Sequence, residues 1–72
     1  METIEFNLEG EYIELLQLLK ATGIAQTGGH AKMIVDDGGV VRDGEVETRK
    51  RAKLRVGDVI EIEGNLKIII NV

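Results

Sequence analysis

The N-terminal part of the chain shows two hydrophobic patterns, one typical of a strand and one typical of a helix. Residues 3–8 alternate apolar and polar side chains, which is the period of two expected for a half-buried strand. Over residues 11–21 the apolar side chains instead recur three and four positions apart, which predicts a helix with a buried stripe. The only aromatic residues, Phe6 and Tyr12, fall on these apolar stripes, so we expect both in the core.

A second helix is predicted over residues 28–36, and Gly38 just beyond it is the residue that stops the helix. The apolar positions in this segment have helical spacing: Ala31, Ile34 and Val35. Thr27 precedes the helix and is a favoured N-cap, because its hydroxyl can accept a hydrogen bond from a free N–H group of the first turn. Asp36 lies at the C-terminal end, where the helix dipole disfavours an anion. An ion pair with Lys32 would offset part of that cost.

The rest of the chain changes to strand and turn patterns. Three turn signals divide it: Asp43-Gly44, Gly57-Asp58 and Gly64-Asn65. The Asp-Gly pair in particular is a strong signal for a two-residue hairpin. The apolar runs predict short strands over residues 40–41, 59–63 and 66–72. We expect the last strand to be covered on both sides or central, with Val72 on the same apolar face as Ile68 and Ile70. The predicted class is α+β: an N-terminal strand and two helices packed on a small, mainly antiparallel sheet.

Composition narrows the functions open to the chain. Its 72 residues, 43% hydrophobic and 31% charged, have the size of one small globular domain, and we expect residues 1–72 to form that single domain. Serine and cysteine are absent and there is one histidine, which excludes the usual acyl-transfer nucleophiles, disulfides and thiolate metal sites. We therefore expect a protein that is not an enzyme and has no cofactor and no metal site.

The sequence also bears on location. No apolar run approaches membrane-spanning length, and the acidic N-terminus differs from the basic-then-apolar start of a secretion signal. We expect a cytoplasmic protein without a membrane partner.

Charge is distributed unevenly along the chain. The net charge is −4, yet residues 48–55 contain five basic side chains and no acidic one: Arg49, Lys50, Arg51, Lys53 and Arg55. Such a run is either a solvated strand edge that discourages aggregation or a contact surface for a polyanion, which would relieve the repulsion among the cations. The run alone favours neither interpretation, but the net charge is no argument against a nucleic-acid partner.

The start of the second predicted helix is another candidate site. Its glycines, Gly28 and Gly29, each lower helix propensity by about 1 kcal/mol relative to alanine. Without side chains they leave the N–H groups open to an anion, and Lys32 adds a positive charge nearby. The alternative is a flexible turn before a short helix. His30 could donate to a phosphate or stack on a base, although an ordinary exposed histidine is the commoner case.

The order of these motifs resembles the S-four (S4) RNA-binding domain, also called the alpha-L motif. The resemblance covers nearly the whole chain and is carried by these segments: Leu18-Leu19-Lys20 with Gly23, Thr27-Gly28-Gly29-His30-Ala31-Lys32, Gly38, residues 43–49, residues 50–53 and Gly57-Asp58. The family usually has serine where this chain has Thr27, which keeps the capping oxygen. Residues 40–42 are Val-Val-Arg, where the family more often alternates apolar, charged and apolar, so Arg42 lies either in a buried position or on the RNA-binding face.

The resemblance implies a non-catalytic module that clamps the backbone of structured RNA, ribosomal or transfer RNA, like the small ribosome-associated members of the family. With both aromatic residues expected in the core, recognition would depend on backbone shape and phosphates rather than on stacking. The expected RNA-binding residues are Thr27, Gly28, Gly29, His30, Lys32, Arg49, Lys50, Arg51 and Lys53. The alternative is a protein-interaction adaptor with the same fold, for which the acidic N-terminal half is the best support.

Overall fold

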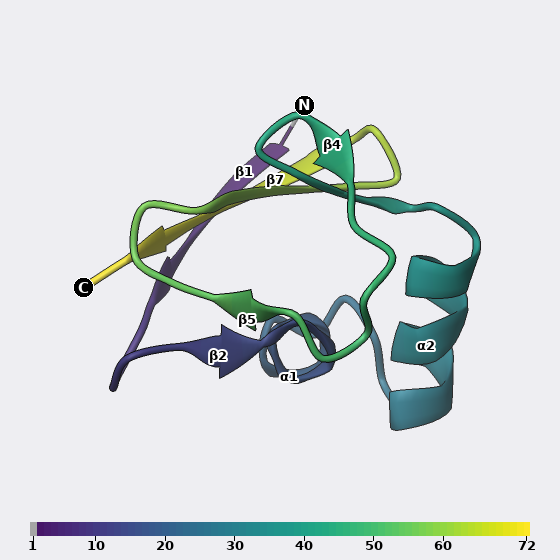
Figure 1. Ribbon diagram of the computed structural model, residues 1–72, viewed down its shortest axis with the longest axis horizontal. Helices are drawn as coiled ribbons and strands as arrows, with labels where there is room; N and C mark the ends of the chain where they lie inside the picture. Colours follow the sequence, from purple (N-terminus) through teal and green to yellow (C-terminus); the bar gives the residue numbers. More distant parts are fainter. Residues whose placement is uncertain (1) are drawn as a thin grey trace.

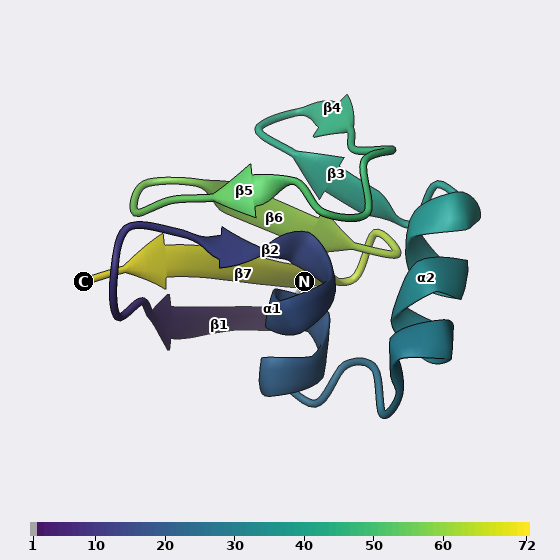
Figure 2. The same cartoon turned by 60° about the horizontal axis from the view of Figure 1, so that its bottom comes forward.

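A five-stranded sheet forms one layer of the structure, a computed structural model that describes residues 2–72 (Figure 1). Its elements follow one another as β1 (Glu2–Asn7), β2 (Ile13–Glu14), α1 (Leu15–Ala21), α2 (Gly28–Asp36), β3 (Val40–Arg42), β4 (Glu45–Val46), β5 (Lys53–Leu54), β6 (Val59–Ile62) and β7 (Leu66–Asn71). Helix α1 and the β2–β5 ribbon lie over one face of the sheet, and α2 stands at one end of it (Figure 2). The α+β class expected from the sequence is confirmed.

The sheet has the strand order β1-β7-β6-β3-β4. The edge strand β1 runs parallel to β7, and the other pairings in this sheet are antiparallel, so the expected mainly antiparallel sheet is also confirmed. β7 is internal, as its apolar residues predicted. The expectation for Val72 is wrong: β7 ends at Asn71, and Val72 beyond it is 91% exposed.

The core fills the space between the sheet and the layer of α1 and the ribbon. Alternate residues of β6 and β7 point into it, because successive side chains of a strand face opposite ways. The largest fully buried side chains are Leu15, Leu18, Leu19, Leu54, Ile60, Ile68 and Ile70. Each contributes about 1.5–3 kcal/mol by leaving water. Phe6 packs half-buried against this cluster, in agreement with its predicted position.

The first helix begins at Leu15, four residues later than its apolar spacing predicted. The preceding residues Ile13 and Glu14 form β2 instead, paired with Leu54 and Lys53 of β5. The backbone N–H of Leu15 donates to the carbonyl of Ala52 at 2.9 Å, so the loop leading into β5 satisfies a donor at the start of the helix. Long-range strand pairing therefore overrides the local helical pattern.

Tyr12 consequently leaves the predicted helix and the predicted core. It lies just before β2 and is 41% exposed. The sequence-based placement of this aromatic side chain is wrong, and with it the expectation that no aromatic ring is available for stacking.

Local signals elsewhere predict the structure well. Helix α2 spans the predicted residues, and the Thr27 hydroxyl accepts a hydrogen bond from the backbone N–H of His30 at 3.0 Å, the expected N-cap. Asp43 and Gly44 both have positive φ, 51° and 91°, as a type I′ hairpin turn requires. They connect β3 to β4 and so position the segment that carries the basic run.

Candidate nucleic-acid interface

Alternation along β5 places three basic side chains on one face of the ribbon. Ala52 and Leu54 are buried, whereas Arg51, Lys53 and Arg55 between and beside them are exposed. On the paired strand, Glu14 contacts Arg51, and the Tyr12 ring lies beneath Lys53 and Arg55. We call this surface the ribbon face; its members are Tyr12, Glu14, Arg51, Lys53 and Arg55.

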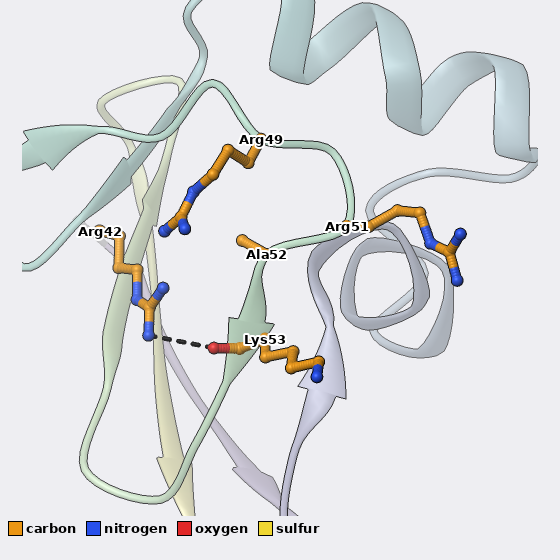
Figure 3. Close-up of a pocket in the computed structure, with 5 residues that line it drawn as sticks. All are labelled: Arg42, Arg49, Arg51, Ala52 and Lys53. Carbon is orange, nitrogen blue, oxygen red and sulfur yellow. Dashed lines mark hydrogen bonds between the residues drawn. The ribbon is translucent and has the colours of Figure 1, made fainter.

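A basic hollow of about 570 Å³ adjoins the ribbon face. It is lined by Arg42, Arg49, Arg51, Ala52 and Lys53 (Figure 3). Arg42 and Arg49 extend toward the same space from β3 and from the loop before β5, and the Arg42 guanidinium donates to the Lys53 carbonyl at 3.1 Å (Figure 3). The guanidinium groups of Arg42 and Arg49 lie on one side of β5, whereas the charged ends of Arg51 and Lys53 point to the other side, toward β2 (Figure 3). Cations on both sides of one short strand form a surface suited to a polyanion.

Arg42 is both partly buried and part of this surface, so its position combines the two possibilities left open by the sequence. Its side chain is 23% exposed, and its guanidinium contacts Asp58 at 2.9 Å and Glu47 at 3.5 Å. In β3 it lies opposite Ile60, on the core-facing side at the margin of the sheet. Its aliphatic stem can pack at that margin while the charged group reaches the basic hollow.

A buried carboxylate, Glu47, fixes the orientation of the two arginines of the basic hollow. Two side-chain nitrogens of Arg49 donate to its two oxygens, each at 3.2 Å, and the Arg49 backbone N–H donates at 3.1 Å. These bonds from Arg49, more than the weaker contact from Arg42, hold the pKa of Glu47 below its ordinary value against the opposing effect of burial. The same carboxylate raises the pKa of Arg49.

Two further carboxylates pair with the basic run from distant elements. Lys50 Nζ lies 3.0 Å from an oxygen of Asp36 at the end of α2, and Arg51 lies 3.2 Å from Glu14 in β2. The expected pair between Lys32 and Asp36 is therefore wrong, because Asp36 contacts Lys50 instead. Each pair has at least one largely exposed partner, Asp36 and Arg51, so solvent screening limits each contribution to at most about 1 kcal/mol.

The start of α2 presents the other predicted residues at the surface. Gly29, His30 and Lys32 are exposed, and Gly28 is half-buried. The Nδ1 atom of His30 accepts a 3.4 Å hydrogen bond from the backbone N–H of Gln26, so this imidazole links the first turn of the helix to the residue before the N-cap. RNA contact by His30 stays a prediction.

The predicted site has two halves, the basic run and the start of α2, and they lie at opposite ends of this helix. The contact between the basic run and this helix is made by Lys50 with Asp36, at the C-terminal end, whereas the glycines lie at the N-terminal end. Nine residues of α-helix span about 13 Å. An RNA that touches both halves must therefore extend along the helix.

Sequence reasoning missed three members of the surface: Tyr12, Arg42 and Arg55. For Arg55 the signal was present, because basic and apolar residues alternate from Arg51 to Arg55, the pattern of a strand with one charged face. The exposure of Tyr12 had no local signal, since it depends on β2 pairing with β5.

The fold and the site together define a class of protein. Two short helices are followed by a hairpin that belongs to the mainly antiparallel sheet and by a basic segment; this is the arrangement of the alpha-L motif. The family model described as the S4 domain matches residues 6–70. The chain belongs to the S4 domain family, and the family expected from the sequence is confirmed.

Similar proteins include one from Escherichia coli and one from Bacillus subtilis. YbcJ of Escherichia coli strain K12 is 41% identical over 54 residues, which cover 75% of this chain and 77% of YbcJ. The "Probable ribosome maturation protein RlbA" of Bacillus subtilis strain 168 is 41% identical over 58 residues, covering 81% of this chain and 82% of that protein. The solution structure of YbcJ, which reveals an alpha-L motif involved in RNA binding, matches 90% of this chain and 85% of its own, with a TM-score of 0.67 and 36% identity.

Residues 2–72 also bear on two other classes of site. Among these residues, no three histidine or acidic side chains come together in a way that could hold a metal ion. Within the same range, neither helix has the length and apolar character needed to cross a membrane.

Proposed function

We propose that this protein is a non-catalytic RNA-binding protein that contacts the backbone of structured RNA through the basic hollow, the ribbon face and the start of α2. The observation that carries the proposal is the set of cations on both sides of β5. Arg42 and Arg49 extend toward the basic hollow of about 570 Å³, and Arg51 and Lys53 extend from the same segment over the ribbon face (Figure 3). Guanidinium groups offer planar pairs of donors that match phosphate oxygens. RNA phosphates would replace condensed counterions with these cations, which favours binding.

Ribosomal RNA is the partner class best supported by the comparisons, with transfer RNA as the other structured RNA expected. The relative RlbA carries the name of a ribosome maturation protein, and YbcJ shares the alpha-L motif involved in RNA binding. The match of one S4 domain to residues 6–70 supports treating this chain as a single binding domain. A cytoplasmic location follows from a ribosomal partner.

A salt series tests the proposal. We expect the affinity for a structured RNA hairpin to fall with rising salt, with a slope of log K against log salt of roughly −3 to −5 if four to six phosphates are neutralised. A slope near zero would show that backbone phosphates are not the ligand and would refute the proposal.

A matched pair of variants locates the site. Replacing Arg51 and Lys53 with alanine should weaken binding and make the slope less negative by about two, whereas replacing Lys20 and Lys67 removes the same charge elsewhere and should change the slope little. Arg49 is a poor choice for this test, because its removal strands the buried carboxylate of Glu47. Equal effects from both double variants would mean that only total charge matters.

A further inference from the structure

Tyr12 is an exposed aromatic ring fixed against two cations of the ribbon face. Lys53 Nζ lies 5.0 Å from the ring centroid and Arg55 Cζ lies 5.9 Å from it, both within the range of a cation–π contact. The backbone beside the ring is held by the pairing of Ile13 with Leu54. The ring therefore has a defined place, although 41% of the residue is exposed to solvent.

A second hollow, of about 330 Å³, opens beside this ring. Phe6, Leu8 and Ile13 supply apolar walls together with Tyr12. Asn7, Gln17 and the carboxylate of Glu9 stand at the same hollow; a carboxylate accepts hydrogen bonds from the amino group of a base but disfavours a phosphate. Amide side chains carry both donors and acceptors. Aromatic and apolar walls with a few polar groups are the usual lining of a small-ligand site.

We propose that Tyr12 and this second hollow bind one unpaired nucleobase of the RNA. The inference rests on the proposed function, since Lys53 and Arg55 would hold the phosphates that flank the base. The Tyr12 ring offers a surface for stacking, and Asn7 and Gln17 offer partners to the edge of the base. Sequence-specific proteins commonly take unstacked RNA bases in this way, on aromatic side chains with hydrogen bonds to the base edge.

The charge around the ring favours a nucleotide over an apolar protein segment. A nucleotide places a flat aromatic group and an anion one ribose apart, and the ribbon face places an aromatic ring and two cations within 6 Å of each other. An apolar peptide would bury Lys53 and Arg55 without neutralising them, which carries a desolvation cost.

Two RNAs and two variants test the inference. The RNAs are one hairpin stem in fully paired form and the same stem with a single bulged nucleotide; the variants are Tyr12→Leu and Tyr12→Phe. We expect the loss of affinity in Tyr12→Leu to be at least about fivefold greater for the bulged stem than for the paired stem, the lower end of the effect of losing one base–aromatic stack. Tyr12→Phe keeps the ring and should bind both RNAs like the unchanged protein.

Tyrosine fluorescence gives an independent readout. The chain has one tyrosine and no tryptophan, so its emission reports on Tyr12 alone, and stacking with a base should quench it. We expect quenching by the bulged stem to exceed quenching by the paired stem at equal occupancy. Circular dichroism of Tyr12→Leu verifies that the variant is folded.

The outcomes separate this inference from the proposed function. If Tyr12→Leu loses the same affinity for both RNAs, or loses none, the base site is refuted and the proposed backbone contacts are not affected. Failure of the unchanged protein to bind either RNA would overturn the proposed function and the base site with it. Tyr12-dependent binding of a protein partner in place of RNA would also refute the inference.

Discussion

Replacing Glu47 with glutamine should destabilise the fold by about 1–2 kcal/mol at neutral pH. Glu47 is 7% exposed and accepts three hydrogen bonds from Arg49, and a hydrogen bond to a charged group contributes about 1.5–3 kcal/mol. The Arg49 side chain is 72% exposed, so solvent screening reduces the contribution well below the sum of three such bonds. Glutamine keeps one acceptor oxygen and turns an amide N–H₂ group toward the arginines, which leaves part of the interaction unmade.

The direction of the Glu47 pKa shift determines how the stability difference between the two proteins changes with pH. The fold lowers the pKa of Glu47 below 4.5, its ordinary value, so the charged carboxylate stabilises the folded state above that pH. This stabilisation is lost as the pH falls through the lowered pKa. Glutamine does not titrate, so the difference between the unchanged protein and the variant should be constant near neutral pH and should shrink in acid.

Urea denaturation followed by circular dichroism measures both effects. For a chain of this size, a loss of 1–2 kcal/mol corresponds to a decrease in Tm of roughly 5–15 °C. Glu45→Gln in the same hairpin is the control: Glu45 is exposed, and surface substitutions of this kind change stability by about 0.5 kcal/mol or less. A Glu47→Gln variant as stable as this control at pH 7, or a difference that persists undiminished in strong acid, would refute the reasoning.

Three further predictions follow from the contacts. Asp36→Asn should tighten RNA binding about twofold to fivefold by releasing Lys50, in keeping with an exposed pair worth up to about 1 kcal/mol. Asp37→Asn, measured by the same titration, is the control: an equal gain in affinity would mean that only the total charge of the protein matters. Thr27→Ala should lower the free energy of unfolding by about 1 kcal/mol through loss of the N-cap, while Thr27→Ser should change it little. Arg55→Ala should make the salt slope of RNA binding less negative by about one; an unchanged slope would remove Arg55 from the interface.

Elements with local determinants were predictable from the sequence. Helix α2 has its capping residue Thr27 beside it, and the β3–β4 turn has both of its special backbone conformations in the adjacent residues Asp43 and Gly44. The β2–β5 ribbon was missed because its signal is shared between Ile13 and Leu54, 41 positions apart. A two-residue ladder leaves no periodicity to detect, so the helical spacing over residues 11–21 gave the wrong helix start.

The sequence predicted the cations of the candidate site but not the carboxylates that pair with them. The basic run stands out in the sequence, and its alternation even indicates which members share a face. The carboxylates that pair with it come from α2, from β2 and from the end of the hairpin: Asp36, Glu14 and Glu47. Glu47 lies two positions from Arg49, but only the folded chain brings Asp36 and Glu14 within 4 Å of their cations, so no short window of sequence contains the full charge balance of the site.

These carboxylates act in two different ways, and burial decides which. Glu47 is enclosed, so a phosphate cannot replace it without leaving its charge unpaired at a cost of several kcal/mol; it orients Arg42 and Arg49 and stays in place. The side chains of Asp36 and Glu14 are 57% and 22% exposed, against 8% for Glu47, so an RNA phosphate can take their place at a lower cost. A chain with a net charge of −4 can therefore present a strongly basic surface when RNA arrives, while its own carboxylates reduce the attraction for anions that cannot displace them.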